Sequence, residues 1–268
     1  MAILMCRPDH FGVEYEINPW MHVANQVDRS RAAQQWDALY RAYAELGQDV
    51  VLVDPVSGLP DMVFTANAGA VWNGTAVLSR FRHPQRQGEE SHWQEAFGQQ
   101  GFDVVVPPRS MYFEGAGDAL FVGDTLFAGY GFRTDRAAHR FVARALGVDV
   151  VSLELVDPRF YHLDTCFCPL NEQTVIFAPE AFSPRSARTI RALVPHVIEV
   201  PTDVAAGFAC NAIALGNRVI SSTAAEHLGP QLHAEGFDTL ALPMTEFMKS
   251  GGGVRCLSLP LDAGKKAA

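Results

Sequence analysis

The chain has no long hydrophobic run, although 48% of its 268 residues are hydrophobic. A helix that crosses a membrane needs about 18 or more consecutive apolar residues, and no stretch of the sequence approaches that length. The first eight residues are largely apolar but lack the layout of a signal peptide. We therefore expect a cytoplasmic protein without a membrane partner.

Cysteine is scarce, and the number of cysteines is odd. An odd, scattered set fits a reducing compartment better than a framework of disulfides. The five cysteines are Cys6, Cys166, Cys168, Cys210 and Cys256.

Positive charge is also in short supply. Lysine and arginine total 21 against 30 acidic residues, which gives a net charge of -9. This balance argues against nucleic acid and anionic membrane surfaces as partners. The sequence also lacks the glycine-rich motifs of dinucleotide and phosphate binding, so we expect no nucleotide cofactor.

Short apolar and β-branched runs recur along the chain, most of them bounded by Gly, Pro, Asn or Asp, as strands are. Several come in pairs around a tight turn, with Asn73-Gly74 as the clearest hairpin signal. Gly123-Asp124 and Gly216-Asn217 repeat that form. The expected strands are 50–53, 70–72, 76–78, 104–106, 120–122, 126–127, 150–153, 174–177, 197–200, 213–215, 219–220, 240–242 and 254–259.

Stretches with helical spacing alternate with the strand pairs. Each is followed shortly by another strand, so the block of strand pair, helix and strand recurs roughly four or five times at a period of about 50 residues. No linker divides the chain, and we expect one domain over residues 1–268, with a disordered tail from 262 to 268. The expected helices are 25–45, 89–100, 134–146, 184–193 and 224–235.

Three consecutive glycines, Gly251–Gly253, run directly toward Cys256. Glycine allows the backbone to approach a ligand closely, so a thiol just beyond such a turn can face a small pocket. Cys256 is therefore the leading candidate for a nucleophile. The alternative is a cysteine buried in the core, which is common for this residue type.

The segment 161–167 places His162 and Asp164 on one side of an expected extended strand. A histidine beside a thiol can accept its proton or activate water. One alternative is a buried histidine with ordinary hydrogen bonds. Another is a zinc site that includes Cys166 and Cys168, but no second ligand pair has zinc-type spacing.

The segment 113–118 holds two carboxylates, Glu114 and Asp118, around Gly115 and Gly117. Carboxylates beside small residues suit a guanidinium, which offers several N–H donors in a planar fork. The alternative is a turn with solvated acids.

Other polar residues have weaker signals. Asn18, Asp61 and Asn67 lie in turn-like segments and could be ordinary turn residues. Arg86 and Arg133 could pair with a substrate carboxylate, or could be solvated surface charges.

Taken together, these segments resemble the guanidino-group modifying enzymes. The motifs Phe-Thr-Ala-Asn, Glu-Gly-x-Gly-Asp, His-Leu-Asp and Gly-Gly-Gly-x-x-Cys occur in the order found in that superfamily. It includes arginine deiminase, dimethylarginine dimethylaminohydrolase, amidinotransferases and the ammonia-producing arginine dihydrolases. The resemblance implies a five-bladed α/β-propeller (pentein) built from ββαβ-type repeats around a central site. It also implies a hydrolase that needs no metal or organic cofactor.

The resemblance assigns a role to each matching residue. Cys256 corresponds to the nucleophile, His162 to the general acid and base, and Glu114 to a carboxylate that holds the guanidinium. The positions implied to contact the substrate are Asn18, Asp61, Asn67, Arg86, Arg133, Asp164 and Asn211.

Asn67 departs from the deiminase pattern, in which a carboxylate stands at this place. The amide is a feature of the arginine dihydrolases, so arginine is the expected small-molecule partner and ornithine, ammonia and carbon dioxide the expected products. Dimethylarginine dimethylaminohydrolase and arginine deiminase stay open as alternatives, and so does a non-catalytic binding protein with the same fold. The sequence leaves open whether the chain forms a homo-oligomer.

Overall fold

The computed structural model describes residues 2–264, and the remainder of the expected disordered tail, 265–268, lies outside the described residues. Fifteen strands are assigned in this part of the chain. They are β1 (Ala2–Cys6), β2 (Asp49–Val53), β3 (Gly69–Trp72), β4 (Thr75–Leu78), β5 (Asp103–Val105), β6 (Ala119–Val122), β7 (Thr125–Tyr130), β8 (Val150–Glu154), β9 (Phe167–Pro169), β10 (Thr174–Phe177), β11 (His196–Glu199), β12 (Ile213–Leu215), β13 (Arg218–Ser222), β14 (Asp238–Leu242) and β15 (Leu259–Pro260).

Eight α-helices lie between these strands within residues 2–264, together with short 3₁₀ turns. They are α1 (Arg29–Glu45), α2 (Pro84–Gln87), α3 (Glu89–Gln99), α4 (Arg136–Leu146), α5 (Pro184–Leu193), α6 (Thr202–Ala206), α7 (Gly229–Ala234) and α8 (Thr245–Met248). None of the helices in this part of the chain combines the length and the hydrophobicity that crossing a bilayer requires.

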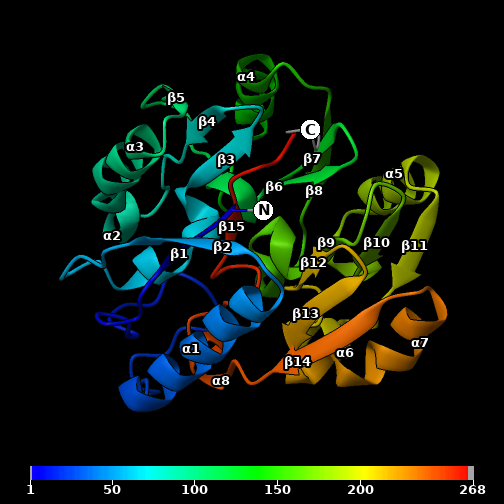
Figure 1. Ribbon diagram of the computed structural model, residues 1–268. Helices are drawn as coiled ribbons and strands as arrows, with labels where there is room; N and C mark the ends of the chain where they lie inside the picture. Colours follow the sequence, from blue (N-terminus) through cyan, green and yellow to red (C-terminus); the bar gives the residue numbers. More distant parts are fainter. Residues whose placement is uncertain (1, 265–268) are drawn as a thin grey trace.

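The strands form five three-stranded sheets, all built on one plan (Figure 1). The innermost strand pairs with the middle strand antiparallel, and the middle strand pairs with the outer strand parallel, as in β3-β4-β5 and β6-β7-β8. A helix leads from middle to outer strand in each sheet, because parallel neighbours need a crossover. The expected ββαβ repeat is confirmed, with five copies.

The innermost strands of all five sheets, β3, β6, β9, β12 and β15, line a single central cavity. The sheets therefore surround a common axis, and the five-bladed α/β-propeller expected from the sequence is confirmed. The segment that enters each innermost strand consequently reaches the same end of the axis.

Strand β15 closes the ring by joining the two ends of the described chain (Figure 1). Leu259 pairs with Leu4 of β1, and β2 adds on the other side of β1. The Ala2 backbone N–H donates to the Asp262 carboxylate at 2.6 Å, and the Asn73 N–H donates to the Ala263 carbonyl at 2.9 Å. The prediction of a disordered tail from 262 onward is therefore wrong for residues 262–264.

The hairpin predictions hold, because their turn residues adopt the backbone that the turns require. Asn73 and Gly74 have φ of 48° and 82°, and Trp72 pairs with Thr75 across them. This is the type I′ geometry favoured between twisted strands. The bends at Gly123-Asp124 and Gly216-Asn217 also join paired strands.

Two helix predictions need correction at their ends. The first helix begins at Arg29 and not at residue 25, because the Asp28 side chain caps it by accepting the Arg31 backbone N–H. The helix expected over 224–235 is a 3₁₀ turn, Thr223–Leu228, followed by α7. Pro230, which lacks a backbone N–H, can join only the first turn of α7 and so separates the two pieces.

Helix α1 contacts the segment that carries Cys256 through a side chain on its buried face. Its buried face includes Leu39 and Tyr43. The Tyr43 hydroxyl lies 2.6 Å from the Ser258 hydroxyl, and both groups are fully buried. This contact fixes the position of the chain two residues beyond Cys256.

The closing strand generates a stability prediction. Leu4 is 1% exposed in β1, between β15 and β2. We expect Leu4→Ala to lower the free energy of unfolding by about 2–5 kcal/mol, because it leaves a cavity in the core. Urea unfolding followed by circular dichroism measures this change.

The matched control is Leu52→Ala in the neighbouring strand β2, where the side chain is 47% exposed. We expect a change within about 0.5 kcal/mol there. Equal losses in the two variants would contradict the account of ring closure.

Candidate active site

The segments that enter the innermost strands bring most of the sequence-predicted site residues together. Asn67 precedes β3, Glu114 precedes β6, and His162 precedes β9. Asn211 and Cys256 precede β12 and β15 in the same way. Each blade of the propeller thus supplies one wall of a single buried site.

Cys256 lies in a turn and not in a strand. The strand expected over 254–259 is wrong except at its end, because only Leu259 and Pro260 pair with β1. The turn depends on close approach by glycine: a Cβ atom at Gly252 would lie 2.4 Å from the Phe64 ring, and Gly251 has φ of 81°. The glycines therefore let the thiol segment pack against the site.

The Asn211 side chain forms hydrogen bonds with both the backbone and the sulfur of Cys256. Its Oδ1 accepts the backbone N–H groups of Arg255 at 3.0 Å and Cys256 at 3.2 Å. Its Nδ2 donates to the Cys256 Sγ at 3.0 Å and to the Asp164 carbonyl at 3.1 Å. A sulfur that accepts an N–H bond is better suited to negative charge, so this contact favours a thiolate.

Asp164 lies directly against the thiol, with its Oδ2 at 3.3 Å from the Cys256 Sγ. Burial raises the pKa of Asp164 to about 7, and the positive charge of Arg255 is the largest influence in the other direction. Burial also raises the pKa of Cys256 well above its ordinary value, and the nearby Asp164 charge raises it further. Without a ligand, Cys256 is a neutral thiol that donates to Asp164.

His162 and Glu114 form the second half of the site. The His162 Nε2 donates to the Glu114 Oε2 at 2.8 Å, and the Arg133 Nη1 donates to the same oxygen at 2.9 Å. Burial alone would raise the pKa of Glu114, but Arg133 and the bond from His162 hold it well below its usual value. Glu114 is therefore an ionised carboxylate that already binds a guanidinium.

Asn67 occupies a fixed orientation between two partners. Its Nδ2 donates to the Glu114 carbonyl at 3.1 Å, and its Oδ1 accepts from the Arg86 Nη1 at 2.9 Å. Arg86 is itself held by a bidentate pair with Glu89 at 2.7 and 2.9 Å. The sequence prediction missed Glu89, although it follows Arg86 by three residues, a spacing at which opposite charges can pair.

The segment around Asn18 reaches across the site. The Asn18 Nδ2 donates to the Ser250 carbonyl at 3.0 Å, and the Ile17 carbonyl accepts from Arg133 at 2.9 Å. The Tyr15 hydroxyl donates to the Asp61 Oδ2 at 2.9 Å. Tyr15 was not expected, and no sequence signal marks it.

Asp61 is buried beside Arg86 and keeps one free acceptor. Its Oδ2 lies 3.9 Å from the Arg86 Nε, while its Oδ1 has no hydrogen-bond partner among the described residues. Burial raises the pKa of this carboxyl, and Arg86 opposes the shift. A ligand that brings an ammonium or N–H group would fill this gap.

The expected strand over 161–167 is wrong in part. Residues Leu163–Thr165 form a 3₁₀ turn, and only the stretch from Phe167 onward is a strand. The Asp118 carboxylate holds this turn by accepting the Leu163 backbone N–H at 3.0 Å. His162 and Asp164 therefore face the site through a turn and not through strand alternation.

The zinc alternative receives no support from the geometry. The Cys166 Sγ contacts the carbonyls of His162 and Leu163, whereas the Cys168 Sγ contacts the Ala212 carbonyl. From residue 2 to residue 264, no group of three His, Cys, Asp or Glu side chains could hold a metal ion. Burial raises the pKa of Cys168 to about 12, so this thiol stays protonated.

Comparison with known proteins finds one family whose model matches nearly the whole chain. Residues 7–262 match the family model described as N,N dimethylarginine dimethylhydrolase, eukaryotic. The N(G),N(G)-dimethylarginine dimethylaminohydrolase of Mycobacterium tuberculosis is 44% identical over 257 residues, which cover 96% of this chain and 84% of that protein.

A second group of relatives is longer. The bifunctional arginine dihydrolase/ornithine cyclodeaminase ArgZ of Synechocystis is 46% identical over 97% of this chain, but the match spans only 37% of ArgZ. The crystal structure of the ArgZ N-terminal domain, with product bound, has a TM-score of 0.95 and 44% identity and covers 98% of both chains. The chain is therefore similar to one part of these bifunctional proteins.

The contact between Asp164 and the thiol generates a prediction. We expect Asp164→Asn to speed alkylation of Cys256 by iodoacetamide at about pH 8, because loss of the negative charge lowers the thiol pKa. Each pKa unit changes the thiolate fraction by about tenfold below the pKa. Peptide mass spectrometry measures the rate at Cys256.

The control is Cys256→Ser, in which any remaining alkylation comes from the four other cysteines, which are all buried. An Asp164→Asn variant that is alkylated no faster than the parent would show that Asp164 does not control the thiol.

Proposed function

Because the chain belongs to the N,N-dimethylarginine dimethylhydrolase family of guanidino-group modifying enzymes, we propose that it hydrolyses the guanidino group of free arginine through a covalent intermediate on Cys256. The proposed overall reaction consumes arginine and two waters and yields ornithine, two ammonia molecules and carbon dioxide. Four groups carry the roles: Cys256 is the nucleophile, His162 the acid and base, and Glu114 and Asp164 hold the cation.

The observation that supports arginine most directly is the free oxygen of Asp164. The Oδ2 faces the Cys256 thiol, whereas the buried Oδ1 has no partner among the described residues. A buried acceptor without a partner is costly, and an N–H group of a bound guanidinium would satisfy it. A dimethylated nitrogen carries no such hydrogen, so this carboxylate favours arginine over dimethylarginine.

The first half of the reaction forms a carbon–sulfur bond. The arriving guanidinium lowers the pKa of Cys256, as a nearby positive charge does, and the thiol proton passes to water. The sulfur attacks the central guanidino carbon, and His162 protonates a terminal nitrogen, which departs as ammonia. A thiouronium intermediate remains, with the carbon still attached to the ornithine chain.

The second half restores the thiol. His162, now neutral, takes a proton from water, and the water oxygen bonds to the thiouronium carbon. The carbon–sulfur bond breaks, a proton from the former thiouronium nitrogen passes to the sulfur, and citrulline forms. The same two steps are then repeated on the ureido group of citrulline. They release the second ammonia and leave a carbamate, which loses carbon dioxide to give ornithine.

Asn67 is the group that we propose as favouring these repeated steps. Its amide is neutral and is oriented by Arg86 on one side and by the Glu114 carbonyl on the other. A neutral ureido group offers no positive charge to a carboxylate, whereas an amide can donate to or accept from it. The site can thus bind both the cation and the neutral intermediate.

One alternative has a specific observation in its favour. The Mycobacterium tuberculosis relative, at 44% identity, bears the name dimethylarginine dimethylaminohydrolase. That activity would release dimethylamine and stop at citrulline. The same four groups could support it if the methyl groups found room beside Asp164.

Product analysis separates these activities. We expect the purified chain to convert arginine to ornithine with release of ammonia, and to act on asymmetric dimethylarginine at least about tenfold more slowly, as loss of one charge-assisted hydrogen bond predicts. Chromatography of the amino acid products and an ammonia assay measure both. Cys256→Ser should fold normally and release nothing.

Dimethylamine from dimethylarginine, without turnover of arginine, would overturn the proposal in favour of the alternative. Turnover by Cys256→Ser would overturn the assignment of the nucleophile.

The role of Asn67 has its own test. We expect Asn67→Asp to raise the ratio of citrulline to ornithine among the products, because the added carboxylate favours the cation over the neutral ureido group. Time courses with arginine and with citrulline as the starting compound measure this ratio. Unchanged conversion of citrulline in the variant would remove Asn67 from the explanation.

A further inference from the structure

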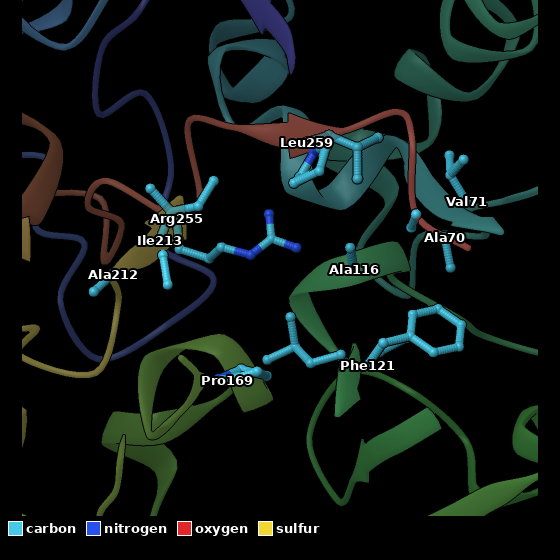
Figure 2. Close-up of a pocket in the computed structure, with 14 residues that line it drawn as sticks. Ala70, Val71, Ala116, Phe121, Pro169, Ala212, Ile213, Arg255 and Leu259 are labelled. Carbon is cyan, nitrogen blue, oxygen red and sulfur yellow. The ribbon is translucent and has the colours of Figure 1, made fainter. Parts of the chain in front are cut away.

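The central cavity lies on the propeller axis, next to the segments that carry the site residues. Most of its lining residues belong to the innermost strands, while Ala116, Ala212 and Arg255 lie in the segments that precede those strands. Its volume is about 170 Å³. Figure 2 shows Phe121 and Pro169 on one side of the cavity and Leu259 on the other.

One charged side chain points into this apolar space. Arg255 is the only charged residue among the 14 that line the cavity, and its guanidinium extends toward Ala116 in Figure 2. The Nη1 donates to the Ser258 carbonyl. Among the salt bridges of residues 2–264, none involves Arg255.

The cavity and the guanidinium together define the chemistry of a ligand. A guanidinium presents parallel N–H groups that match a carboxylate. The other lining residues are Ala, Val, Leu, Ile, Phe and Pro, which offer apolar contact and no side-chain donors. A phosphate would leave several oxygens unsatisfied there, whereas a carboxylate with a short hydrocarbon chain would satisfy both parts.

The size of the cavity fits such a ligand. A cavity of about 150 Å³ in a protein core can hold benzene, which has six carbon atoms. A carboxylate of four or five carbons is of comparable size.

We propose that the central cavity binds a short-chain aliphatic monocarboxylate, whose carboxylate pairs with Arg255 and whose chain packs against Phe121 and Leu259, and that occupation of this site slows reaction at Cys256. The nearby strands reach the cavity from all five blades, so the ligand would contact the propeller at its centre.

The coupling follows from the position of Arg255 in the chain. It is bonded directly to Cys256, and the Asn211 Oδ1 accepts the backbone N–H groups of both residues. A bound carboxylate would offset the Arg255 charge and would itself place a negative charge near Cys256. A nearby negative charge raises the pKa of a thiol and so reduces the fraction of thiolate.

Isothermal titration with butyrate tests the binding site. We expect butyrate to bind the parent chain, and uncharged butyramide and inorganic phosphate to bind at least about tenfold more weakly, as loss of a charge-assisted bond or of apolar contact predicts. Arg255→Gln should weaken the binding of butyrate by a similar factor. Arg188→Gln, at an exposed position on α5, is the matched control and should bind butyrate normally.

Ala214→Leu provides a second variant that keeps Arg255. Ala214 lines the cavity from β12, so the larger side chain should fill it and abolish butyrate binding. Iodoacetamide alkylation of the parent chain should slow as butyrate saturates it, and should not slow in Ala214→Leu.

The proposal is overturned if butyrate does not bind, if both variants bind it like the parent, or if butyramide or phosphate binds equally well. An alkylation rate that ignores saturating butyrate would overturn the coupling to Cys256. None of these measurements depends on turnover of arginine, so their outcome is separable from the proposed function.

Discussion

The pairing of β15 with β1 is the constraint on which the rest of the structure depends. Cys256 lies three residues before β15, and the ring can close only if that segment enters the axis beside the segments of the other four blades. The glycines that precede Cys256 make this approach possible, because the Phe64 ring leaves no room for a Cβ atom at Gly252. The segment that closes the ring therefore also brings Cys256 into the site.

In this site, two buried carboxylates have pKa values that are shifted in opposite directions. Glu114 and Asp164 are both 0% exposed, but only Glu114 has an arginine as a direct partner. Its pKa therefore lies below the usual range, while burial raises that of Asp164 to about 7. One carboxylate is always ionised, and the other can share a proton with the Cys256 thiol. This division suits a site that must hold a cation and activate a nucleophile on its arrival.

The sequence was informative where local chemistry decides the structure. The Asn73-Gly74 turn and the helix 184–193 follow from residue preferences, and the motifs around Glu114 and Cys256 carry the resemblance to guanidino-group enzymes. It was misleading where tertiary contacts decide. The 161–167 segment alternates like a strand, but the buried Asp118 carboxylate holds its centre in a 3₁₀ turn. Residues 254–257 alternate too, yet the Asn211 side chain holds them in a turn. Neither partner is close in sequence, so no local pattern could reveal these contacts.

The central claim is that the Cys256 sulfur forms a covalent bond to the guanidino carbon. Acid quenching during steady-state turnover of arginine, followed by peptide mass spectrometry, tests it most directly. The account predicts that the peptide containing Cys256 gains the mass of arginine less one ammonia. Turnover of arginine with an adduct on a different residue, or with no adduct when the reaction is quenched on the millisecond timescale, would contradict it.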